Sequence, residues 1–279
     1  MEYQVLENKI IINDCKDFNI EHILECGQIF TYKKTSDLCY EVYSKDKFAA
    51  VKFIENKYVI TTDNPEYFVD FFDLKTDYSK IKSTLGKDKN VVDAINYGYG
   101  IRILKQDILE VVIGFIISAN NNIERIKKIM QKLREFGTNY GNYYGFPNLE
   151  QLSKITEEQF KQIGAGYRAK YLVNTVQQLK NIDIQKTFLY DTSTLKNWLL
   201  SLCGVGPKVA DCILLFGYKR AESFPVDTWI EKVYFDIFKT KKSRQKMSED
   251  LVNYFKDLSG YAQQYLFFYK RNFSNIYQN

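Results

Sequence analysis

The segment Leu199–Gly217, LLSLCGVGPKVADCILLFG, decides the fold that this sequence predicts. One apolar helical stretch ends at Leu202, a Gly-Val-Gly turn follows, and Pro207 and Lys208 open a second helical stretch. Proline is favourable in the first turn of a helix because its missing N–H would have no partner there. The sequence therefore predicts two helices joined by a tight hairpin, with Lys208 beside the turn.

The turn of this hairpin, formed by Gly204, Val205 and Gly206, predicts a phosphate contact. Its glycines let the backbone turn sharply and expose N–H groups beside a helix N-terminus. Such groups bind a phosphate without reading the base sequence. Similar hairpins occur in DNA-binding proteins that carry out no reaction, and a bare pair of helices is sometimes only scaffold. The hairpin alone therefore indicates no enzyme.

Hydrophobic periodicity divides the chain into two parts. Residues 1–62 consist of short segments rich in β-branched and aromatic residues, whereas apolar residues recur at helical spacing from about Asn64 onward. The predicted strands are Lys9–Asn13, Gln28–Lys33, Leu38–Ser44, Lys47–Ile54 and Lys57–Thr62, with one helix at Asp17–Leu24. We expect an α+β fold, in which a small N-terminal antiparallel β-sheet domain (residues 1–88) precedes a larger all-helical domain (residues 89–279) that carries the helix–hairpin–helix motif.

The charge is distributed unevenly between these two parts. Residues 1–88 hold 12 basic and 16 acidic side chains, a net charge of −4, and residues 89–279 hold 27 basic and 18 acidic side chains, a net charge of +9. All seven arginines lie in the second part. Arginine matches phosphate and guanine edges, so the asymmetry favours a polyanionic partner there. A solvated lysine-rich surface explains the same charges equally well.

The cysteines and the single histidine exclude several classes of site. The five cysteines are widely spaced and form no zinc-binding pattern, and no nucleotide-binding loop is present, so we predict neither a metal nor a cofactor. A Ser-His-Asp or Cys-His mechanism would have to use His22. Reduced thiols, an acidic N-terminus and no apolar run of about 18 residues favour an intracellular, cytoplasmic protein with no membrane span. We also expect a monomer.

A second segment, Phe224–Trp229 (FPVDTW), places Asp227 19 residues after Lys208. A hairpin followed by an aspartate at this distance resembles the signature of the helix–hairpin–helix (HhH-GPD) DNA glycosylase superfamily. Breaking an N-glycosidic bond builds positive charge on the sugar, which a carboxylate stabilises. A neutral lysine amine can attack the sugar carbon and form an imine that permits β-elimination. We therefore interpret Lys208 as the nucleophile and Asp227 as its charged helper, although Asp227 also fits a helix N-cap.

Three further segments narrow the substrate. Cys26–Gln28, Ser118–Arg125 and Ile163–Lys170 follow the order and spacing of the 8-oxoguanine DNA glycosylases, and the resemblance spans residues 20–270. It implies a bifunctional glycosylase and AP lyase that flips 8-oxoguanine, paired with cytosine, out of double-stranded DNA, excises it and nicks the strand. The carbonyl of Gly27 would accept the N7–H that 8-oxoguanine has and guanine lacks.

The same resemblance implies roles for residues around the flipped nucleotide. Cys212 and Phe268 would sandwich the damaged base, and Gln264 would meet its Watson–Crick edge. Four residues would contact the rest of the duplex: Asn120 in the hole left by the base, Tyr167 as a wedge in the stack, and Arg125 and Arg168 on the orphaned cytosine.

One departure and two alternatives remain. Trp229 stands where the eukaryotic pattern has a histidine that contacts phosphate. The chain could also be a glycosylase for a different damaged base, although members with a four-cysteine iron–sulfur cluster are excluded because no cysteine follows Cys212. The second alternative is a nonenzymatic helix–hairpin–helix module in which Lys208 only contacts phosphate.

Overall fold

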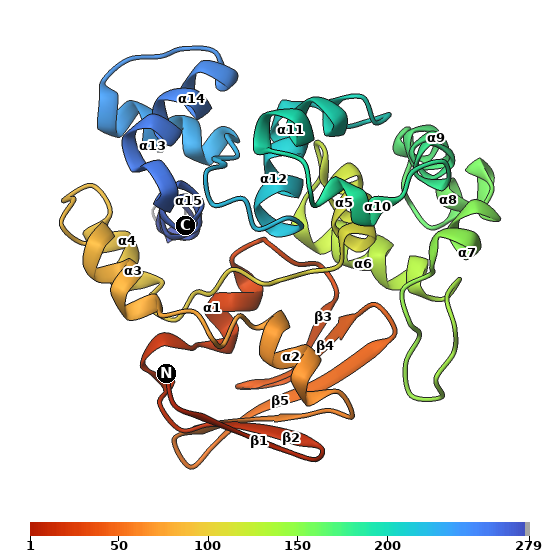
Figure 1. The fold of residues 1–279 in the computed structure, drawn as a ribbon, viewed down its shortest axis with the longest axis horizontal. Helices are drawn as coiled ribbons and strands as arrows, with labels where there is room; N and C mark the ends of the chain where they lie inside the picture. The colour runs from red at the N-terminus through yellow and green to blue at the C-terminus, as the bar shows by residue number, and fades with distance from the viewer. Residues whose placement is uncertain (277–279) are drawn as a thin grey trace.

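The N-terminal part of the molecule is built on one sheet. The computed structural model describes the backbone of residues 1–276 and shows a six-stranded antiparallel sheet followed by helices (Figure 1). The strand order is β1-β2-β6-β5-β4-β3. The strands are β1 (Tyr3–Leu6), β2 (Lys9–Ile12), β3 (Tyr32–Ser36), β4 (Cys39–Ser44), β5 (Lys47–Ile54) and β6 (Lys57–Thr61). The predicted fold class is confirmed.

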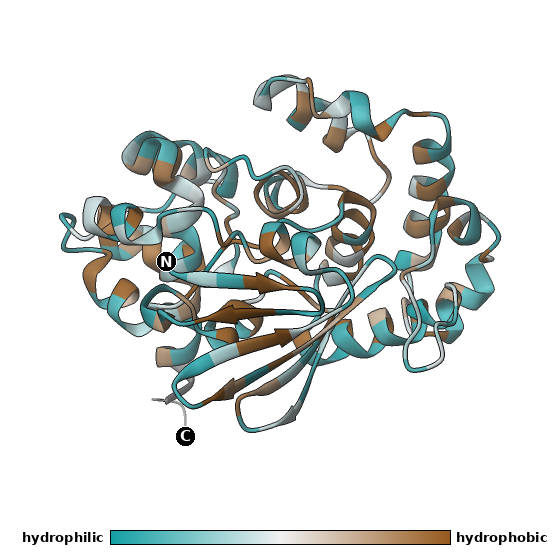
Figure 2. Cartoon of the chain, turned by 60° about the horizontal axis from the view of Figure 1, so that its bottom comes forward, coloured by the Kyte–Doolittle hydropathy of each residue, from teal (hydrophilic) through white to brown (hydrophobic). Residues whose placement is uncertain are grey.

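Alternation along the strands buries one face of this sheet. Ile10 and Ile12 on β2 and Val42 on β4 are fully buried, and their neighbours on the other face are more exposed. Two helices, α1 (Ile20–Glu25) and α2 (Pro65–Phe71), contribute the apolar residues that complete this core. Figure 2 shows the hydrophobic stretches of the strands in brown. The pattern is the one expected for an antiparallel sheet with one solvated face.

The helical part packs around two long buried helices. α5 (Ile108–Ser118) and α12 (Pro207–Phe216) lie against each other in the largest core. The remaining helices are α3 (Tyr78–Leu85), α4 (Val92–Tyr97), α6 (Ile123–Arg134), α7 (Leu149–Ser153), α8 (Glu157–Gln162), α9 (Arg168–Lys180), α10 (Ile184–Thr187), α11 (Thr192–Leu200), α13 (Thr228–Phe238), α14 (Arg244–Phe255) and α15 (Ser259–Ile276). A third core joins α4 to α13, α14 and α15, so helices far apart in the sequence share one interior.

The predicted strand at Gln28–Lys33 is wrong for its first four residues. Residues 28–31 form a loop and β3 begins only at Tyr32. The amide of Gln28 is fully buried, and it donates to the carbonyls of Ile23 (2.9 Å) and Arg102 (2.7 Å) and accepts from the N–H of Leu104 (2.8 Å). These bonds hold residue 28 in the protein interior, so the chain joins the sheet only at Tyr32.

Buried ionic contacts fasten the sheet to the helices. Arg134 on α6 lies 2.6 Å from Glu110 on α5, and both side chains are almost fully buried. Glu110 also accepts from the N–H of Lys45 in the β4–β5 turn (3.0 Å), and Arg134 donates to the carbonyl of Lys45 (3.0 Å). The two parts are thus joined through groups that solvent does not reach. The domain boundary at residues 88 and 89 stays a prediction.

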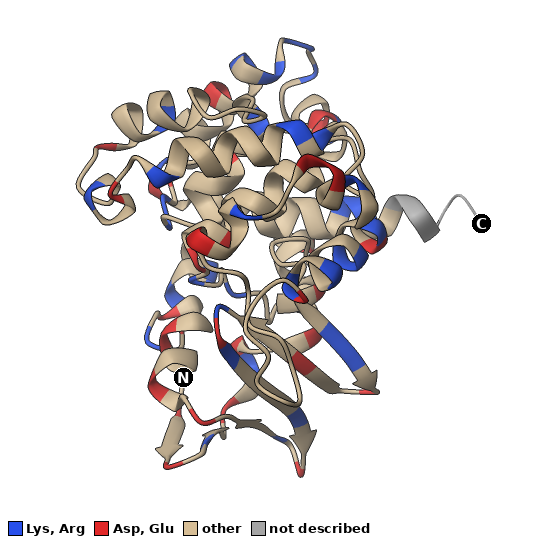
Figure 3. Ribbon diagram, turned by 90° about the vertical axis from the view of Figure 1, so that its right-hand side faces the viewer, with Lys and Arg blue, Asp and Glu red and all other residues tan. Residues whose placement is uncertain are grey.

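Some of the arginines that make the second part of the chain basic are buried and do not contribute to its surface. Figure 3 shows lysine and arginine positions, in blue, on both the sheet and the helices. Arg102, Arg134 and Arg168 are buried and donate to backbone carbonyls or, for Arg134, also to Glu110. These three guanidinium groups stabilise the fold, so a count of arginines overstates the surface that a polyanion can contact.

Within residues 1–276, no helix is both long enough and apolar enough to cross a membrane.

Candidate active site

A small cavity brings together five of the predicted residues. Gly27, Lys208, Cys212, Asp227 and Gln264 all line it, although more than 230 residues of chain separate the first from the last. The cavity lies between the loop after α1, the buried pair α5 and α12, the start of α13 and the face of α15. Its volume of about 50 Å³ has room for only a few water molecules.

Lys208 reaches this cavity from the first turn of α12. Gly206 is the N-cap of the helix and Pro207 occupies the first helical position, as the sequence predicts. The Lys208 Nζ lies 5.4 Å from the centroid of the Phe115 ring. Among the described residues, no carboxylate lies within ion-pair distance of this amine. The amine contacts the Cys212 thiol one turn further along α12, so no charged group of the protein competes with a substrate for it.

Asp227 is held rigidly as the N-cap of α13, which confirms that part of the prediction. Its Oδ1 accepts hydrogen bonds from the N–H groups of Trp229 (2.9 Å) and Ile230 (3.0 Å). Within the described part of the chain, nothing bonds to Oδ2. One oxygen thus fixes the orientation of the carboxylate, and the other stays free to face positive charge in the cavity.

Cys212 lies one helical turn after Lys208 and presents a neutral thiol to the cavity. Burial raises the pKa of Cys212 to about 11, against the opposing effect of the nearby Lys208 ammonium. At neutral pH the sulfur is therefore protonated. It offers a flat apolar contact and no nucleophile, since the thiolate is the reactive form.

Gly27 occupies a position that requires glycine. Its φ of +81° lies in the left-handed region, and a Cβ there would lie 3.1 Å from Cε1 of Phe267. The next residue, Gln28, fixes this loop through its buried amide and through its carbonyl, which accepts from Gln106 (2.8 Å). The backbone of Gly27 is therefore presented to the cavity at a defined place.

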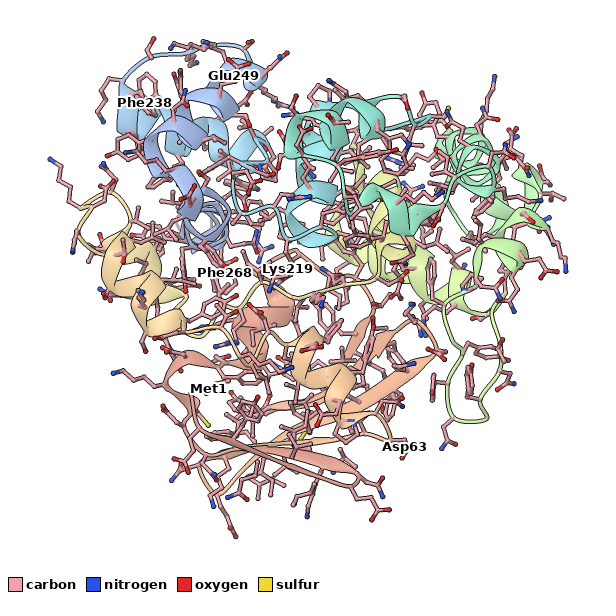
Figure 4. All side chains as sticks on the ribbon, in the orientation of Figure 1. Met1, Asp63, Lys219, Phe238, Glu249 and Phe268 are labelled. Carbon is pink, nitrogen blue, oxygen red and sulfur yellow. The ribbon has the colours of Figure 1, made fainter. Side chains whose placement is uncertain are left out.

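The structure does not bring Phe268 to the cavity. Phe267 lines the cavity, whereas Phe268 is 5% exposed and packs on Tyr97 of α4 (5.2 Å between ring centroids) and His22 of α1 (5.6 Å) (Figure 4). Successive residues of a helix point about 100° apart, so only one of the two can face the cavity. The sequence offers two glutamine–phenylalanine pairs four residues apart, Gln263 with Phe267 and Gln264 with Phe268. Contacts of Phe268 with α1 and α4 decide which phenylalanine faces the cavity.

Gln264 lines the cavity as predicted, together with Gln263, which the sequence reasoning missed. The Nε2 of Gln264 donates to Oε1 of Gln263 (2.8 Å), whose own Nε2 lies 3.4 Å from the carbonyl of Pro225. Among the described residues, the buried Oε1 of Gln264 has no partner. Buried polar atoms are nearly always hydrogen-bonded, so this orphan marks a place where a ligand fits.

The two loops predicted to face the duplex lie side by side. Asn120, in the α5–α6 loop, is exposed and has a φ of +49°. Tyr167, in the α8–α9 loop, is 56% exposed, and its hydroxyl lies 3.4 Å from the carbonyl of Ala119. Arg125 is exposed and donates to the carbonyl of Gly164 (3.2 Å). These three residues form one continuous surface beside the cavity-lining α5.

Arg168 behaves differently from Arg125. It is buried, and its guanidinium donates to the carbonyls of Ala119 (2.7 Å), Asn120 (2.8 Å) and Ala165 (3.3 Å). These bonds fasten the α8–α9 loop to the α5–α6 loop. A contact between Arg168 and an orphaned cytosine stays a prediction, and it would require some of these bonds to break.

The hairpin turn is formed as predicted, with unequal roles for its three residues. Gly204 has a φ of +81°, and a Cβ there would lie 2.7 Å from Cβ of Tyr171. Val205 is buried and its N–H donates to the carbonyl of Leu202 (3.1 Å), so that N–H is not free for a phosphate. Gly206 is exposed and a Cβ there would meet nothing within 4 Å. It is the residue of the turn where a phosphate can approach.

Comparison with known families agrees with this geometry. Residues 10–112 match the model of the 8-oxoguanine DNA glycosylase N-terminal domain, and residues 113–256 match that of the HhH-GPD superfamily base excision DNA repair protein. The N-glycosylase/DNA lyase OGG1 of Arabidopsis thaliana is 33% identical over 70% of this chain, which spans 57% of that protein's length. A probable N-glycosylase/DNA lyase of Methanothermobacter thermautotrophicus is 31% identical over 72% of each chain.

A solved structure shares the whole fold. The 8-oxoguanine glycosylase/lyase of Clostridium acetobutylicum, crystallised with double-stranded DNA containing cytosine opposite 8-oxoguanine, is 34% identical to this chain. The similarity covers 98% of this chain and 99% of that one, with a TM-score of 0.92.

Proposed function

Because the chain belongs to the HhH-GPD superfamily of base excision DNA repair proteins and carries the 8-oxoguanine DNA glycosylase N-terminal domain, we propose that it is a bifunctional glycosylase and AP lyase. Its substrate is 8-oxoguanine paired with cytosine in double-stranded DNA. The observation that carries the proposal is the meeting of Lys208 and Asp227 in one cavity with the backbone of Gly27. A nonenzymatic module has no need of this arrangement.

The reaction begins when the Lys208 amine attacks C1′ of the damaged nucleotide. The N-glycosidic bond breaks, its electron pair leaves with the base, and the base takes up a proton. Asp227 stabilises the positive charge that develops on the sugar, and its bonded Oδ1 keeps the carboxylate from rotating away. Ring opening and loss of the amine protons then give an imine between Nζ and C1′.

Strand cleavage follows from the imine. It makes a C2′ hydrogen acidic, and removal of that proton expels the 3′ phosphate by β-elimination. Water then hydrolyses the imine and regenerates Lys208. A glycosylase that used water in place of the amine would release the base and leave the strand intact, so the lysine determines the lyase activity.

Base recognition requires the cavity to open. A purine is much larger than a space of about 50 Å³, so Phe267 and its neighbours must move when the base enters. Phe267 and Cys212 then contact the two faces of the base, and the unpartnered Oε1 of Gln264 accepts from its Watson–Crick edge. These contacts offset the few kcal/mol that unstacking costs.

The test is covalent trapping. The protein is incubated with borohydride and a duplex that contains one 8-oxoguanine opposite cytosine, and wild type is compared with Lys208→Gln. We expect a stable protein–DNA adduct with wild type and none with the variant. Asp227→Asn keeps the helix cap while it removes the negative charge, so this variant should fold normally and trap far more slowly.

Two outcomes would replace the proposal. If the 8-oxoguanine duplex gives no adduct and an abasic duplex does, the chemistry stands and the assigned base is wrong. If the protein binds both duplexes but forms a covalent adduct with neither, the nonenzymatic module becomes the better interpretation. We also expect the active species to be a monomer, which size-exclusion chromatography of the protein–DNA complex tests.

A further inference from the structure

Arg271 has a partly unsatisfied guanidinium beside the cavity. It lies on α15 one turn beyond Phe267, and its guanidinium carbon is 5.2 Å from the centroid of that ring. Nη2 donates to the carbonyl of Glu25, and Nε donates to Oδ1 of Asn272 (3.2 Å). The third nitrogen, Nη1, is buried and has no partner among the residues that the structure describes.

This nitrogen lies next to the residue that faces the base. A Cβ on Gly27 would lie 3.3 Å from Nη1 of Arg271, so the free donor and the backbone of Gly27 are immediate neighbours. The Phe267 ring, which lines the cavity, lies 3.1 Å from the same point. Movement of Phe267 on base entry would therefore expose this hydrogen-bond donor beside the backbone of Gly27.

We propose that Arg271 is a specificity-determining residue, whose Nη1 donates a hydrogen bond to the C8 carbonyl oxygen of the flipped 8-oxoguanine. This inference rests on the proposed function. On its imidazole edge, 8-oxoguanine presents an N7–H donor beside a C8 carbonyl acceptor. Guanine presents an N7 acceptor beside a C8–H. A backbone carbonyl beside a guanidinium N–H complements the first edge at both positions and the second at neither.

The energetics favour such a contact. A buried donor that has no partner costs about 1–3 kcal/mol, and the two bonds that hold the rest of the guanidinium prevent Nη1 from turning to solvent. An acceptor on the ligand removes this cost, whereas a C8–H leaves it in place. The unpaired donor thus rejects guanine as well as binding the damaged base, because leaving a polar group unmatched discriminates more strongly than apolar contact does.

The experiment exchanges one atom in the ligand and one side chain in the protein. Single-turnover excision is measured on duplexes that contain 8-oxoguanine or 8-thioguanine opposite cytosine. In 8-thioguanine the N7–H is retained and the C8 acceptor becomes a weakly accepting sulfur. Wild type is compared with Arg271→Met, which keeps the apolar stem over Phe267 and removes the donors. Cleavage of an abasic duplex measures the Lys208 chemistry without any base.

Arg271→Met should excise 8-oxoguanine about tenfold to a hundredfold more slowly than wild type, as expected for a hydrogen bond to a charged group. Its cleavage of the abasic duplex should be unchanged. The exchange of oxygen for sulfur should slow wild type and have little effect on Arg271→Met, so that the two changes are not additive. The greater size of sulfur acts on both proteins alike and cancels in this comparison.

Tyr32→Phe is the matched control. The Tyr32 hydroxyl is also buried and lies near Arg271, but Tyr32 lines an outer cleft with Lys127 and not the cavity. This variant should keep the full sensitivity to the sulfur exchange.

Several results would overturn the inference. A wild type that excises 8-thioguanine as fast as 8-oxoguanine rules out the contact without any need for a variant. Equal sulfur effects in wild type and Arg271→Met do the same, as does an Arg271→Met protein that loses abasic cleavage in parallel with excision. A wild type that cleaves neither the 8-oxoguanine duplex nor the abasic duplex instead contradicts the proposed function itself.

Discussion

Two arginines with buried guanidinium nitrogens contact the N-terminal part of the chain near Gly27, and they differ in one respect. Arg102 is fully buried, and it donates to the carbonyls of Phe72 (3.1 Å), Asp17 (3.0 Å) and Thr76 (2.9 Å), and also to that of Asp73. Arg271 is held by two acceptors and keeps Nη1 without a partner among the described residues. Burial lowers the pKa of both guanidinium groups.

The difference separates scaffold from binding site. The side-chain donors of Arg102 and Gln28 themselves are all used inside the protein, so a ligand has nothing to add to these two groups. Around the cavity, Nη1 of Arg271 and Oε1 of Gln264 are both buried and both unpartnered within the described chain. Such atoms cost stability, and beside a cavity a bound ligand can supply the missing partner.

The largest effect is expected from Arg102→Met. The substitution removes the guanidinium donor from four carbonyls, so the free energy of unfolding should fall by about 4 kcal/mol. Equilibrium unfolding in urea measures this, with Arg271→Met as the comparison. Because Arg271 already has an unsatisfied nitrogen, its replacement should cost markedly less. Equal losses from the two variants would show that the contrast between the two regions is wrong.

Gly27→Ala tests whether the Gly27 loop reads the base or only supports the fold. A left-handed backbone costs a non-glycine residue about 1–2 kcal/mol, and the new Cβ meets Phe267 and Arg271. Since the shifted carbonyl no longer matches N7–H, single-turnover excision of 8-oxoguanine should fall about a hundredfold. Cleavage of an abasic duplex should change far less. A parallel loss of both activities would mean that the loop supports Lys208 and does not read the base.

The scaffold region also predicts a response to pH. His22 packs on Tyr99 (4.9 Å between ring centroids), its Nδ1 accepts from the N–H of Gly100 (3.4 Å), and burial lowers the pKa of His22 to about 4. A lowered histidine pKa means that the folded state disfavours the proton. The stabilisation is complete above the unfolded pKa of about 6.5 and is lost as the pH falls toward 4.

The measurement compares wild type with His22→Gln. The difference between their unfolding free energies should shrink by about 2 kcal/mol between pH 7 and pH 4, as the linkage relation requires. Carboxylates that titrate in this range act on both proteins and cancel. A difference that stays constant across the range would show that His22 remains accessible to protons in the folded state.

The smallest effect on stability is expected from Gln264→Leu, and its sign is informative. Replacement of an amide whose buried Oε1 lacks a partner should leave the unfolding free energy unchanged or raise it by up to about 1 kcal/mol. Excision should nevertheless slow by about tenfold, because the Watson–Crick edge loses an acceptor. Thermal unfolding and single-turnover kinetics on the same preparation test both statements. A destabilised variant would place Gln264 with the scaffold.

Sequence patterns were sufficient for elements whose neighbours are close along the chain. The bounds of β5 and the Asp227 cap of α13 were predicted without error, because strand alternation and helix capping are local signals. The hairpin with Lys208 was predicted for the same reason. Its meeting with Asp227 came from the superfamily resemblance, since a separation of 19 positions along the chain carries no information about distance in space.

The failures have a common physical cause. Gln28 leaves the strand pattern because its amide bonds to Arg102, which lies far along the sequence. Phe268 was chosen over Phe267 because the two differ only in which neighbouring helix each meets, and periodicity contains no information about neighbours. Strand β1 was not predicted from the sequence, because its residues are mostly exposed and show no buried face. In each case a long-range contact decides between locally equal choices.

The buried pair of Arg134 and Glu110 has a mechanical consequence. It fastens the β4–β5 turn to α5 and α6, and Lys219 adds a further link to Asp73 (2.5 Å). A body fastened in this way is stiff and changes shape very little under load. On the proposed function, the deformation that frees a base must then occur in the nucleic acid, whose bending costs a few kcal/mol and varies with sequence. Flexible steps next to a lesion should be repaired faster than rigid ones.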